Sequence, residues 1–229
     1  MKKLNKSLDQ AIELHKKGYA EEALSLYLNM LSEKNKNSKL LFHIGNAYLQ
    51  TKRFDLAIEY YKKTISTDQN HFKAYNNLGG TLSTLGRYEE AIEIYKKTLK
   101  INPDFSDAYS NLGSCYHNLN QYEDSIFNYN KAIKLNPNNF SAHNNLGSAY
   151  KEINQNENAI SSYNKAIQIN PDYYIAYNNL GNLFQEIKLF ENAVENYRKV
   201  IELKPDYKYV IGKLMHARMR ISDWQNYEE

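Results

Sequence analysis

Apolar residues recur along the chain at helical spacing, in short runs separated by polar turns. In the segment 72–105 the apolar positions step by three and four residues on either side of a glycine, at Tyr75, Leu78, Leu82 and Leu85 and then at Tyr88, Ala91, Ile92, Tyr95 and Leu99. This spacing puts apolar side chains on one face of a helix. The segment therefore predicts two helices joined at Gly86, with Pro103 ending the second and Asp104 placed to cap the helix that follows.

The same pattern returns every 34 residues. All four prolines and five of the nine glycines keep this step, at Pro103, Pro137, Pro171 and Pro205 and at Gly45, Gly79, Gly113, Gly147 and Gly181. The period divides the chain without an insertion into five full copies, 38–71, 72–105, 106–139, 140–173 and 174–207. A strict period of this length indicates a repeat architecture in which each unit stacks on its neighbours.

The two ends of the chain follow the 34-residue repeat frame less closely than the five full copies do. Residues 1–37 predict a degenerate N-terminal copy, because Gln10 stands at a core position where the later copies have Leu or Ile. Residues 208–229 begin a further copy in which Met215 replaces the glycine. We interpret this segment either as a capping helix, with Trp224 packed against it, or as the junction to a domain that is missing from this sequence.

Each copy needs its two helices to approach closely. Gly79 on the first and Ala91 on the second are small enough to allow this, and large residues are expected to fill the remaining core. The largest of them form a column with the same period, Tyr61, Tyr95, Tyr129, Tyr163 and Tyr197. A lone hairpin of this size cannot bury both of its faces, so we expect the hairpins to stack into a solenoid.

This set of apolar, glycine and proline positions resembles the tetratricopeptide repeat over residues 38–207. The resemblance implies an all-α fold, a right-handed superhelical solenoid of helix-turn-helix tetratricopeptide repeats. It further implies that the first helices line a concave groove that binds peptides or partner proteins, and that no repeat unit is itself catalytic.

Composition and charge narrow the class of partner. With 29 basic and 26 acidic residues the formal net charge is +3, too balanced to argue for nucleic acid or an anionic membrane surface. No run of about 18 apolar residues predicts a membrane span. We expect a cytoplasmic protein that binds proteins or extended peptides, without a nucleic-acid or membrane partner. The unfinished last hairpin leaves apolar surface open, which allows a homodimer through the C-terminal helix.

No catalytic constellation is visible in the chain. The six histidines are scattered over different copies, and there is no His-Glu-x-x-His motif, glycine-rich phosphate loop or nucleophile elbow. The single cysteine, Cys115, excludes a disulfide framework, and no Cys/His set has metal-ligand spacing. We therefore expect neither an enzyme nor a cofactor or metal site in this chain.

One recurring polar column is not explained by packing. Two positions before each repeat glycine stand His43, Asn77, Asn111, Asn145 and Asn179, and directly before the column most copies carry a second asparagine, Asn76, Asn144 and Asn178. Asparagine is disfavoured inside helices because its side chain competes for backbone hydrogen bonds. Each carboxamide offers a donor and an acceptor, which suits the backbone of an extended peptide. We predict that these eight residues bind peptide; the alternative is that the column merely joins adjacent repeats.

This ladder resembles the tetratricopeptide region of O-GlcNAc transferases of the SPINDLY type, where asparagines at the matching place hold acceptor polypeptide. A carboxylate clamp like that of chaperone adaptors is disfavoured, because Phe42, Asn76 and Ser110 stand where its first lysine would be. Residues 216–224 resemble the junction before the catalytic region of bacterial relatives, with Ser222 in place of a cysteine. Two functions stay open: a peptide-binding scaffold, or the acceptor-recognition region of a glycosyltransferase that lacks its catalytic domain.

Overall fold

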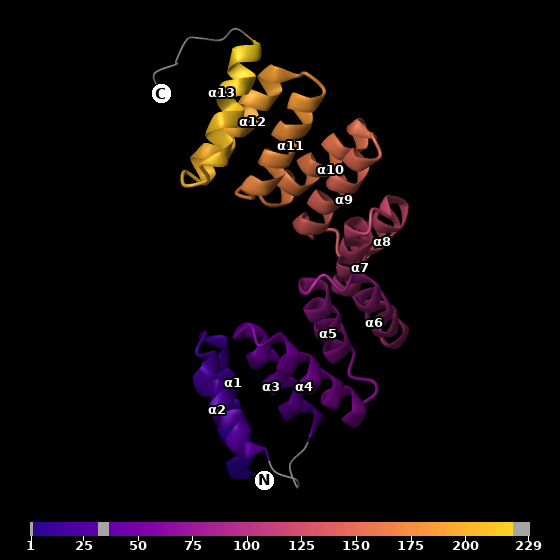
Figure 1. The fold of residues 1–229 in the computed structure, drawn as a ribbon, viewed down its shortest axis with the longest axis vertical. Helices are drawn as coiled ribbons and strands as arrows, with labels where there is room; N and C mark the ends of the chain where they lie inside the picture. Colours follow the sequence, from indigo (N-terminus) through magenta and orange to yellow (C-terminus); the bar gives the residue numbers. More distant parts are fainter. Residues whose placement is uncertain (1, 32–36, 222–229) are drawn as a thin grey trace. The chain divides into compact units, whose positions relative to one another are not determined.

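The computed structural model describes residues 2–31 and 37–221, with side chains from residue 7 onward (Figure 1). Over these ranges the chain forms thirteen helices and no strand, which confirms the all-α class. The helices are α1 (Lys2–Lys16), α2 (Ala20–Met30), α3 (Ser38–Gln50), α4 (Phe54–Thr67), α5 (Phe72–Thr84), α6 (Tyr88–Ile101), α7 (Ser106–Asn118), α8 (Tyr122–Leu135), α9 (Phe140–Glu152), α10 (Asn156–Ile169), α11 (Tyr174–Glu186), α12 (Phe190–Leu203) and α13 (Tyr209–Arg220).

The helices follow the 34-residue frame, so that each odd-numbered helix is the first helix of a copy and each even-numbered helix the second. Figure 1 shows the helices of a copy side by side, for example α3 with α4 and α11 with α12. The chain divides into two compact units, Met1–Leu119 and Asn120–Glu229. The division falls at the turn between α7 and α8, within the copy 106–139.

The turn between the two helices of each copy contains one residue with left-handed backbone. Gly86 has a φ of +75°, which confirms the predicted break. At the same place in the other copies Gly18 adopts this conformation too, and so do four residues of other types, Lys52, Asn120, Asn154 and Lys188. Left-handed backbone costs a non-glycine residue about 1–2 kcal/mol, so the packing of the helices, and not local preference, holds these turns.

The first helices begin after a second recurring position. Asn37, His71 and Asn139 precede α3, α5 and α9, and each accepts a hydrogen bond from the backbone N–H three residues on, at 2.8, 3.2 and 3.0 Å. In the copy 106–139 the equivalent residue before the helix is Phe105, and its side chain makes no hydrogen bond to the start of α7. The expectation that Asp104 caps α7 is therefore wrong, because Asp104 lies one residue before the cap position.

Within each hairpin the repeat glycine makes room for a tyrosine ring. A Cβ added at Gly79 would lie 2.8 Å from Cε1 of Tyr95, and one added at Gly181 would lie 2.7 Å from Cε1 of Tyr197. An aromatic ring on the second helix therefore takes the space beside each of these glycines. The predicted pairing with a small residue is seen at Gly147, where an added Cβ would also lie 3.1 Å from the backbone oxygen of Ala159, the residue that corresponds to Ala91. The tyrosine column is fully buried, which confirms its predicted place in the core: Tyr61, Tyr95, Tyr129, Tyr163 and Tyr197.

The terminal helices differ from the others in what they bury. In α1, Leu8 and Ala11 are buried, but Gln10 is exposed. The expectation that Gln10 occupies a core position is wrong: the equivalent residues Ile44 and Leu78 are buried, but none of the described helices covers the face of α1 that carries Gln10. At the other end, α13 packs on α12 through Val210, Leu214 and Ala217. Trp224 and Ser222, which entered the two interpretations of this segment, lie outside the described residues.

Candidate functional site

Within each unit the first helices lie next to one another and carry the predicted polar column. In the unit Met1–Leu119 contacts join α1 with α3, α3 with α5, and α5 with α7, and in the other unit they join α9 with α11. Contacts between first helices bring side chains from successive copies within hydrogen-bonding reach. We call the asparagines that bond across this face the carboxamide ladder, made up of Asn46, Asn76, Asn77, Asn111, Asn144, Asn145 and Asn179.

In the first unit the ladder runs through three helices. Nδ2 of Asn77 donates a hydrogen bond to Oδ1 of Asn46 at 2.9 Å, and Nδ2 of Asn111 donates to Oδ1 of Asn76 at 3.3 Å. Within α5, Nδ2 of Asn76 donates to Oδ1 of Asn77, also at 3.3 Å. An unbroken series of carboxamide bonds therefore joins α3, α5 and α7.

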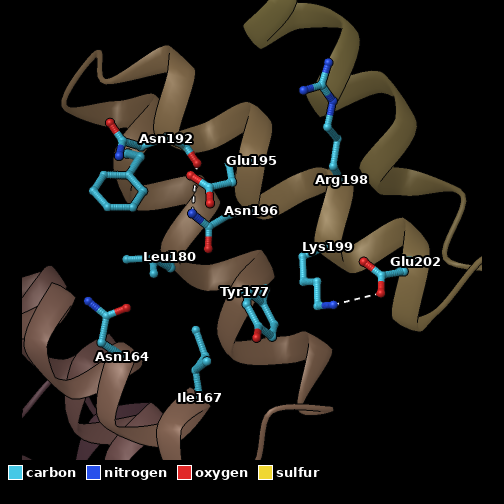
Figure 2. Close-up of a pocket in the computed structure, with 11 residues that line it drawn as sticks. Asn164, Ile167, Tyr177, Leu180, Asn192, Glu195, Asn196, Arg198, Lys199 and Glu202 are labelled. Carbon is cyan, nitrogen blue, oxygen red and sulfur yellow. Dashed lines mark hydrogen bonds and ion pairs between the residues drawn. The ribbon is translucent and has the colours of Figure 1, made fainter.

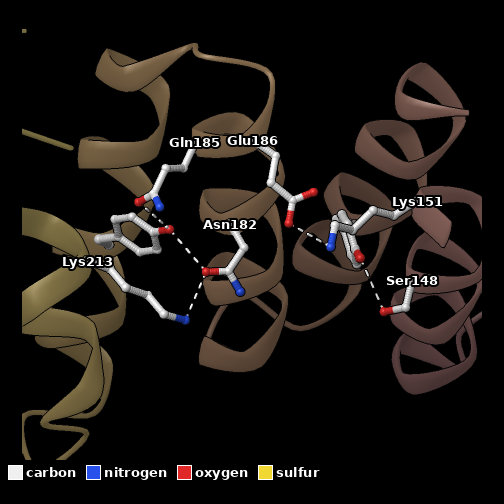
Figure 3. Close-up of polar contacts among 8 residues, drawn as sticks. Ser148, Lys151, Asn182, Gln185, Glu186 and Lys213 are labelled. Carbon is white, nitrogen blue, oxygen red and sulfur yellow. Dashed lines mark hydrogen bonds and ion pairs between the residues drawn. The ribbon is translucent and has the colours of Figure 1, made fainter. Parts of the chain in front are cut away.

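The second unit repeats this arrangement and ends it with a lysine. Nδ2 of Asn144 donates to Oδ1 of Asn145 at 3.1 Å, and Nδ2 of Asn179 donates to Oδ1 of Asn144 at 3.0 Å. Lys213 stands 34 residues after Asn179. Its ammonium donates to Oδ1 of Asn178 at 3.1 Å. It also donates to Oδ1 of Asn182 at 2.9 Å, as Figure 3 shows. The prediction missed Lys213, although its position in the frame marks it as the next member of the column.

For three of the donors, the side chains available in the preceding copy explain which bond is made. Asn77 reaches back 31 residues to Asn46, because a phenylalanine stands 35 residues before it and carries no acceptor. Asn111 reaches back 35 residues to Asn76, because a glycine stands 31 residues before it. Lys213 has a longer side chain and three N–H donors, and it makes both bonds.

A second set of polar residues, directly after the repeat glycines, supports the buried tyrosines. The hydroxyl of Tyr197 donates to Oδ1 of Asn182 at 3.0 Å, and that of Tyr163 donates to Oγ of Ser148 at 3.2 Å (Figure 3). In the first unit Asn46 Oδ1 accepts in the same way from the hydroxyl of Tyr61, at 2.9 Å. Sequence reasoning missed these acceptors; their signal is that small or polar residues recur at this place with the same period.

The predicted site residues differ in solvent exposure. Asn144 and Asn178 are 3% and 8% exposed, so they lie within the stack of repeats. A second group is half-buried at the surface of the first helices: Asn76, Asn77, Asn111, Asn145 and Asn179. A carboxamide has two N–H donors and two acceptor lone pairs, and the ladder uses at most one of each on every member of the column. The column therefore keeps hydrogen-bonding capacity toward solvent while it also joins adjacent repeats.

His43 lies at the N-terminal end of the column and has a different environment. Its ring stacks on that of Tyr27, with centroids 5.8 Å apart and an interplanar angle of 17°. Burial, helped by the positive charge of Lys39, lowers the pKa of His43 to about 4. The predicted peptide-binding residue His43 is thus a neutral, aromatic member of the face at pH 7, and the described contacts do not join it to the ladder.

A groove lies on the opposite, second-helix side of the last two full copies. It has a volume of about 640 Å³, and α10, α11 and α12 line it. Figure 2 shows Ile167, Tyr177 and Leu180 turned toward its centre, and the ion pair between Lys199 and Glu202 at 2.8 Å at its edge. We call this the α11 groove; its remaining lining residues are Asn164, Phe184, Asn192, Glu195, Asn196 and Arg198. None of the predicted peptide-binding residues lines it.

The single cysteine lies in the core. Cys115 is buried, its Sγ lies 3.6 Å from Oγ of Ser83, and burial raises the pKa of its thiol. This is the environment of a packing residue, because a reactive cysteine requires a stabilised thiolate. Across residues 2–31 and 37–221 no three His, Cys, Asp or Glu side chains gather as metal ligands. No helix in these ranges combines the length and apolar character of a membrane span.

Sequence profiles identify the repeats. A profile described as "TPR repeat" matches residues 81–120, 113–154 and 147–188, and two profiles described as "Tetratricopeptide repeat" match residues 38–71 and 174–207 and residues 60–93. The chain belongs to the tetratricopeptide repeat family. This confirms the resemblance predicted for residues 38–207. The resemblance to O-GlcNAc transferases stays a prediction, as do the bounds assigned to the terminal copies.

Solved structures with the same architecture support the family assignment. A crystal structure of MamA is 30% identical, covers 72% of this chain and 97% of its own, and has a TM-score of 0.65. YrrB, described as a tetratricopeptide repeat protein with an unusual peptide-binding site, is 21% identical, with coverages of 84% and 97% and a TM-score of 0.65. PilF of Pseudomonas aeruginosa is 17% identical, with coverages of 94% and 96% and a TM-score of 0.79. A comparison with curated protein sequences finds no match.

Proposed function

We propose that this tetratricopeptide repeat protein is a scaffold that binds extended polypeptide on its first-helix face. The observation that carries the proposal is the hydrogen-bonding capacity that the half-buried asparagines of the ladder keep toward solvent, once per repeat. An extended peptide presents one N–H and one C=O per residue, which a carboxamide matches whatever the peptide's side chains are. Each bond contributes about 0.5–1.5 kcal/mol, so several give weak, sequence-tolerant binding.

The partner in this proposal is a protein segment, and the role of the chain is binding and not catalysis. Each first helix offers neutral donors and acceptors, and no nucleophile stands beside a base within the column. YrrB, which shares the fold, is described as having a peptide-binding site, which makes such a site compatible with this architecture. A cytoplasmic location, and the absence of cofactor, nucleic-acid and membrane partners, belong to the proposal as predictions from composition.

The sharpest test of the ladder uses Asn145. Unlike Asn111 and Asn179, whose bonds join adjacent repeats, Asn145 bonds only within its own helix in the described contacts. We expect Asn145→Ala to weaken the binding of extended peptides two- to tenfold, which corresponds to one lost hydrogen bond. Affinities are read by fluorescence anisotropy over a panel of labelled peptides, with the helical circular dichroism signal as the check on folding.

The matched control is Asn130→Ala, an exposed asparagine on the second helix α8, which should leave every affinity unchanged. Triple replacement of Asn111, Asn145 and Asn179 by Ala should weaken binding more than tenfold. It should also lower the melting temperature, because it removes two bonds between repeats. A triple variant that stays helical and binds the whole panel like the wild-type chain would refute the proposal.

The glycosyltransferase alternative would use the same ladder for acceptor recognition. The C-terminal motif that suggested it ends at Ser222, Asp223 and Trp224, outside the described residues. The scaffold function and the glycosyltransferase function predict different masses for the native protein on a denaturing gel. A band near 26.8 kDa favours the scaffold, and a much larger band favours the recognition region of a longer enzyme.

A further inference from the structure

A small apolar groove lies between α12 and α13. It has a volume of about 270 Å³ and is lined by Ile201, Ile211, Leu214 and Met215 and by two arginines, Arg198 and Arg218. We call it the α13 groove. An exposed apolar stripe continues it along the helix, because Ile211, Met215 and Met219 are spaced by four residues and are 42%, 45% and 56% exposed.

The α13 groove repeats the α11 groove one copy later. Ile201 and Leu214 stand 34 residues after Ile167 and Leu180, which line the α11 groove. In the earlier groove the second helix α12 forms the remaining wall (Figure 2). No helix of the described residues takes the corresponding place over α13. The repeat geometry therefore leaves room for a helix to pack beside α13, as α12 packs beside α11.

Because of Met215, the second helix of an ordinary repeat, with its buried tyrosine, does not fit beside α13. It occupies the frame position of Gly181, over which the ring of Tyr197 lies so closely that an added Cβ would be 2.7 Å from it. A methionine side chain fills the volume that such a ring would need. Methionine also adapts its shape to varied apolar partners, so the stripe suits a helix that packs on top of Met215.

The charged residues that line the α13 groove determine which kind of helix is complementary to it. The α12 wall of the α11 groove carries charges of both signs, Glu195 and Glu202 together with Arg198 and Lys199. The charged residues that line the α13 groove are both arginines, and α13 itself carries three basic residues and no acidic one. A helix with acidic residues beside its apolar stripe would meet opposite charge here. A second copy of α13 would meet like charge, which opposes association.

We propose that the α13 groove binds an amphipathic helix of a partner protein. Its apolar stripe packs on Ile211, Met215 and Met219, and its acidic residues pair with Arg198, while Arg218 adds to the positive charge of the groove. The twelve residues of α13 span about 18 Å at 1.5 Å per residue, so a partner helix of about three turns covers the stripe. This helix-in-groove mode is independent of the carboxamide ladder, which lies on the first helices of the other copies.

The test uses three synthetic helical peptides of equal length and the full chain. The first carries leucines four residues apart flanked by glutamates, the second has lysines in place of the glutamates, and the third has serines in place of the leucines. Fluorescence anisotropy should show the first peptide binding at least tenfold more tightly than either of the others. Raised salt should weaken the first complex, because exposed charge pairs are screened.

Variants locate the site and separate it from the proposed function. Arg198→Glu and Met215→Ser should each weaken binding of the acidic peptide at least tenfold, and Arg198→Lys should retain most of it. Lys97→Glu reverses an exposed charge on α6 in the other unit and should have no effect. Asn145→Ala, which weakens the binding of extended peptides, should also leave this complex unchanged. Circular dichroism checks that each variant is folded.

Four results would overturn the proposal. These are equal affinity for the acidic and basic peptides, full binding by Arg198→Glu, and no measurable binding of the acidic peptide by the full chain. The fourth is self-association in sedimentation velocity that Met215→Ser abolishes, because a second copy would then be the occupant of the groove.

Discussion

The ring of Tyr197 lies against the backbone of Gly181, so that a Cβ at position 181 would be 2.7 Å from Cε1 of the ring. Tyr197 is fully buried and its ring is held by the helices around it. We therefore expect Gly181→Ala to destabilise the protein by about 1–3 kcal/mol through overpacking, measured by urea denaturation. Gly212, on the exposed side of α13, has nothing within 4 Å of an added Cβ. Gly212→Ala should instead stabilise by up to about 1 kcal/mol. Equal stability of the two variants would contradict this reading of the glycine column.

The tyrosine hydroxyls provide a second test, because two of them differ in their partners. Tyr197 donates to Oδ1 of Asn182, whereas the hydroxyl of Tyr27 is buried and has no hydrogen-bond partner among the described residues. Ile12 stands where an acceptor would be, fifteen residues before Tyr27. Tyr197→Phe should cost about 0.5–1.5 kcal/mol, and Tyr27→Phe should cost nothing or stabilise the fold. The melting temperatures of the two variants make the comparison. An equal loss in both would show that the hydrogen bonds of the Tyr197 hydroxyl to Asn182 and Gln185 contribute nothing.

The stability of the N-terminal unit should depend on the protonation of His43. Burial, reinforced by the positive charges of Lys39, His15, His71 and Lys16, lowers the pKa of His43 to about 4, below the ordinary value of 6.5. Between these two pH values the unfolded chain binds more protons than the folded one, so this contribution is complete above pH 6.5 and is lost as the pH falls toward 4.

The loss attributable to His43 should be on the order of 1–2 kcal/mol, after allowance for solvent screening at a half-buried site. His43→Phe keeps a ring to stack on Tyr27 and removes the titration. Urea denaturation at pH 7 and pH 4.5 should show a smaller pH-dependent loss in His43→Phe than in the wild-type chain. Identical pH dependence in both would exclude His43 as the source.

Lys213 should hold α13 in place. Its ammonium makes hydrogen bonds to Asn178 and Asn182, and burial lowers its pKa. Hydrogen bonds to charged groups contribute about 1.5–3 kcal/mol, so in Lys213→Ala the amides of α13 should exchange with solvent at least tenfold faster. Lys213→Asn restores the residue type of the column and should protect α13 better than alanine does. Hydrogen exchange in α13 that is unchanged by Lys213→Ala would show that apolar packing alone anchors the helix.

The errors and omissions of the sequence reasoning have identifiable physical causes. Gln10 matches a core position of the repeat but is exposed. The repeat pattern shows which residues are equivalent, but burial also depends on whether a neighbouring helix covers them. The left-handed turn at Lys188 carries no sequence signal, since helix packing imposes the conformation on an ordinary residue. Lys213 and Asn182 could be found from the period, but Lys213 differs in residue type from the asparagines of its column, and the column of Asn182 mixes asparagine, serine and glycine.

The sequence by itself determined the all-α repeat, its period, the hairpin turns and the buried tyrosine column. A strict 34-residue repeat of helical spacing permits one assignment of core and surface in each copy, and burial of apolar area enforces it. Only the tertiary structure decided how the asparagines divide their hydrogen bonds. Asn179 shows this, because the preceding copy offers it two acceptors, Asn144 and Ser148, 35 and 31 residues before it, and the sequence does not choose between them. The packing of α9 against α11 decides between them, because it brings Asn144 within hydrogen-bonding distance of Asn179.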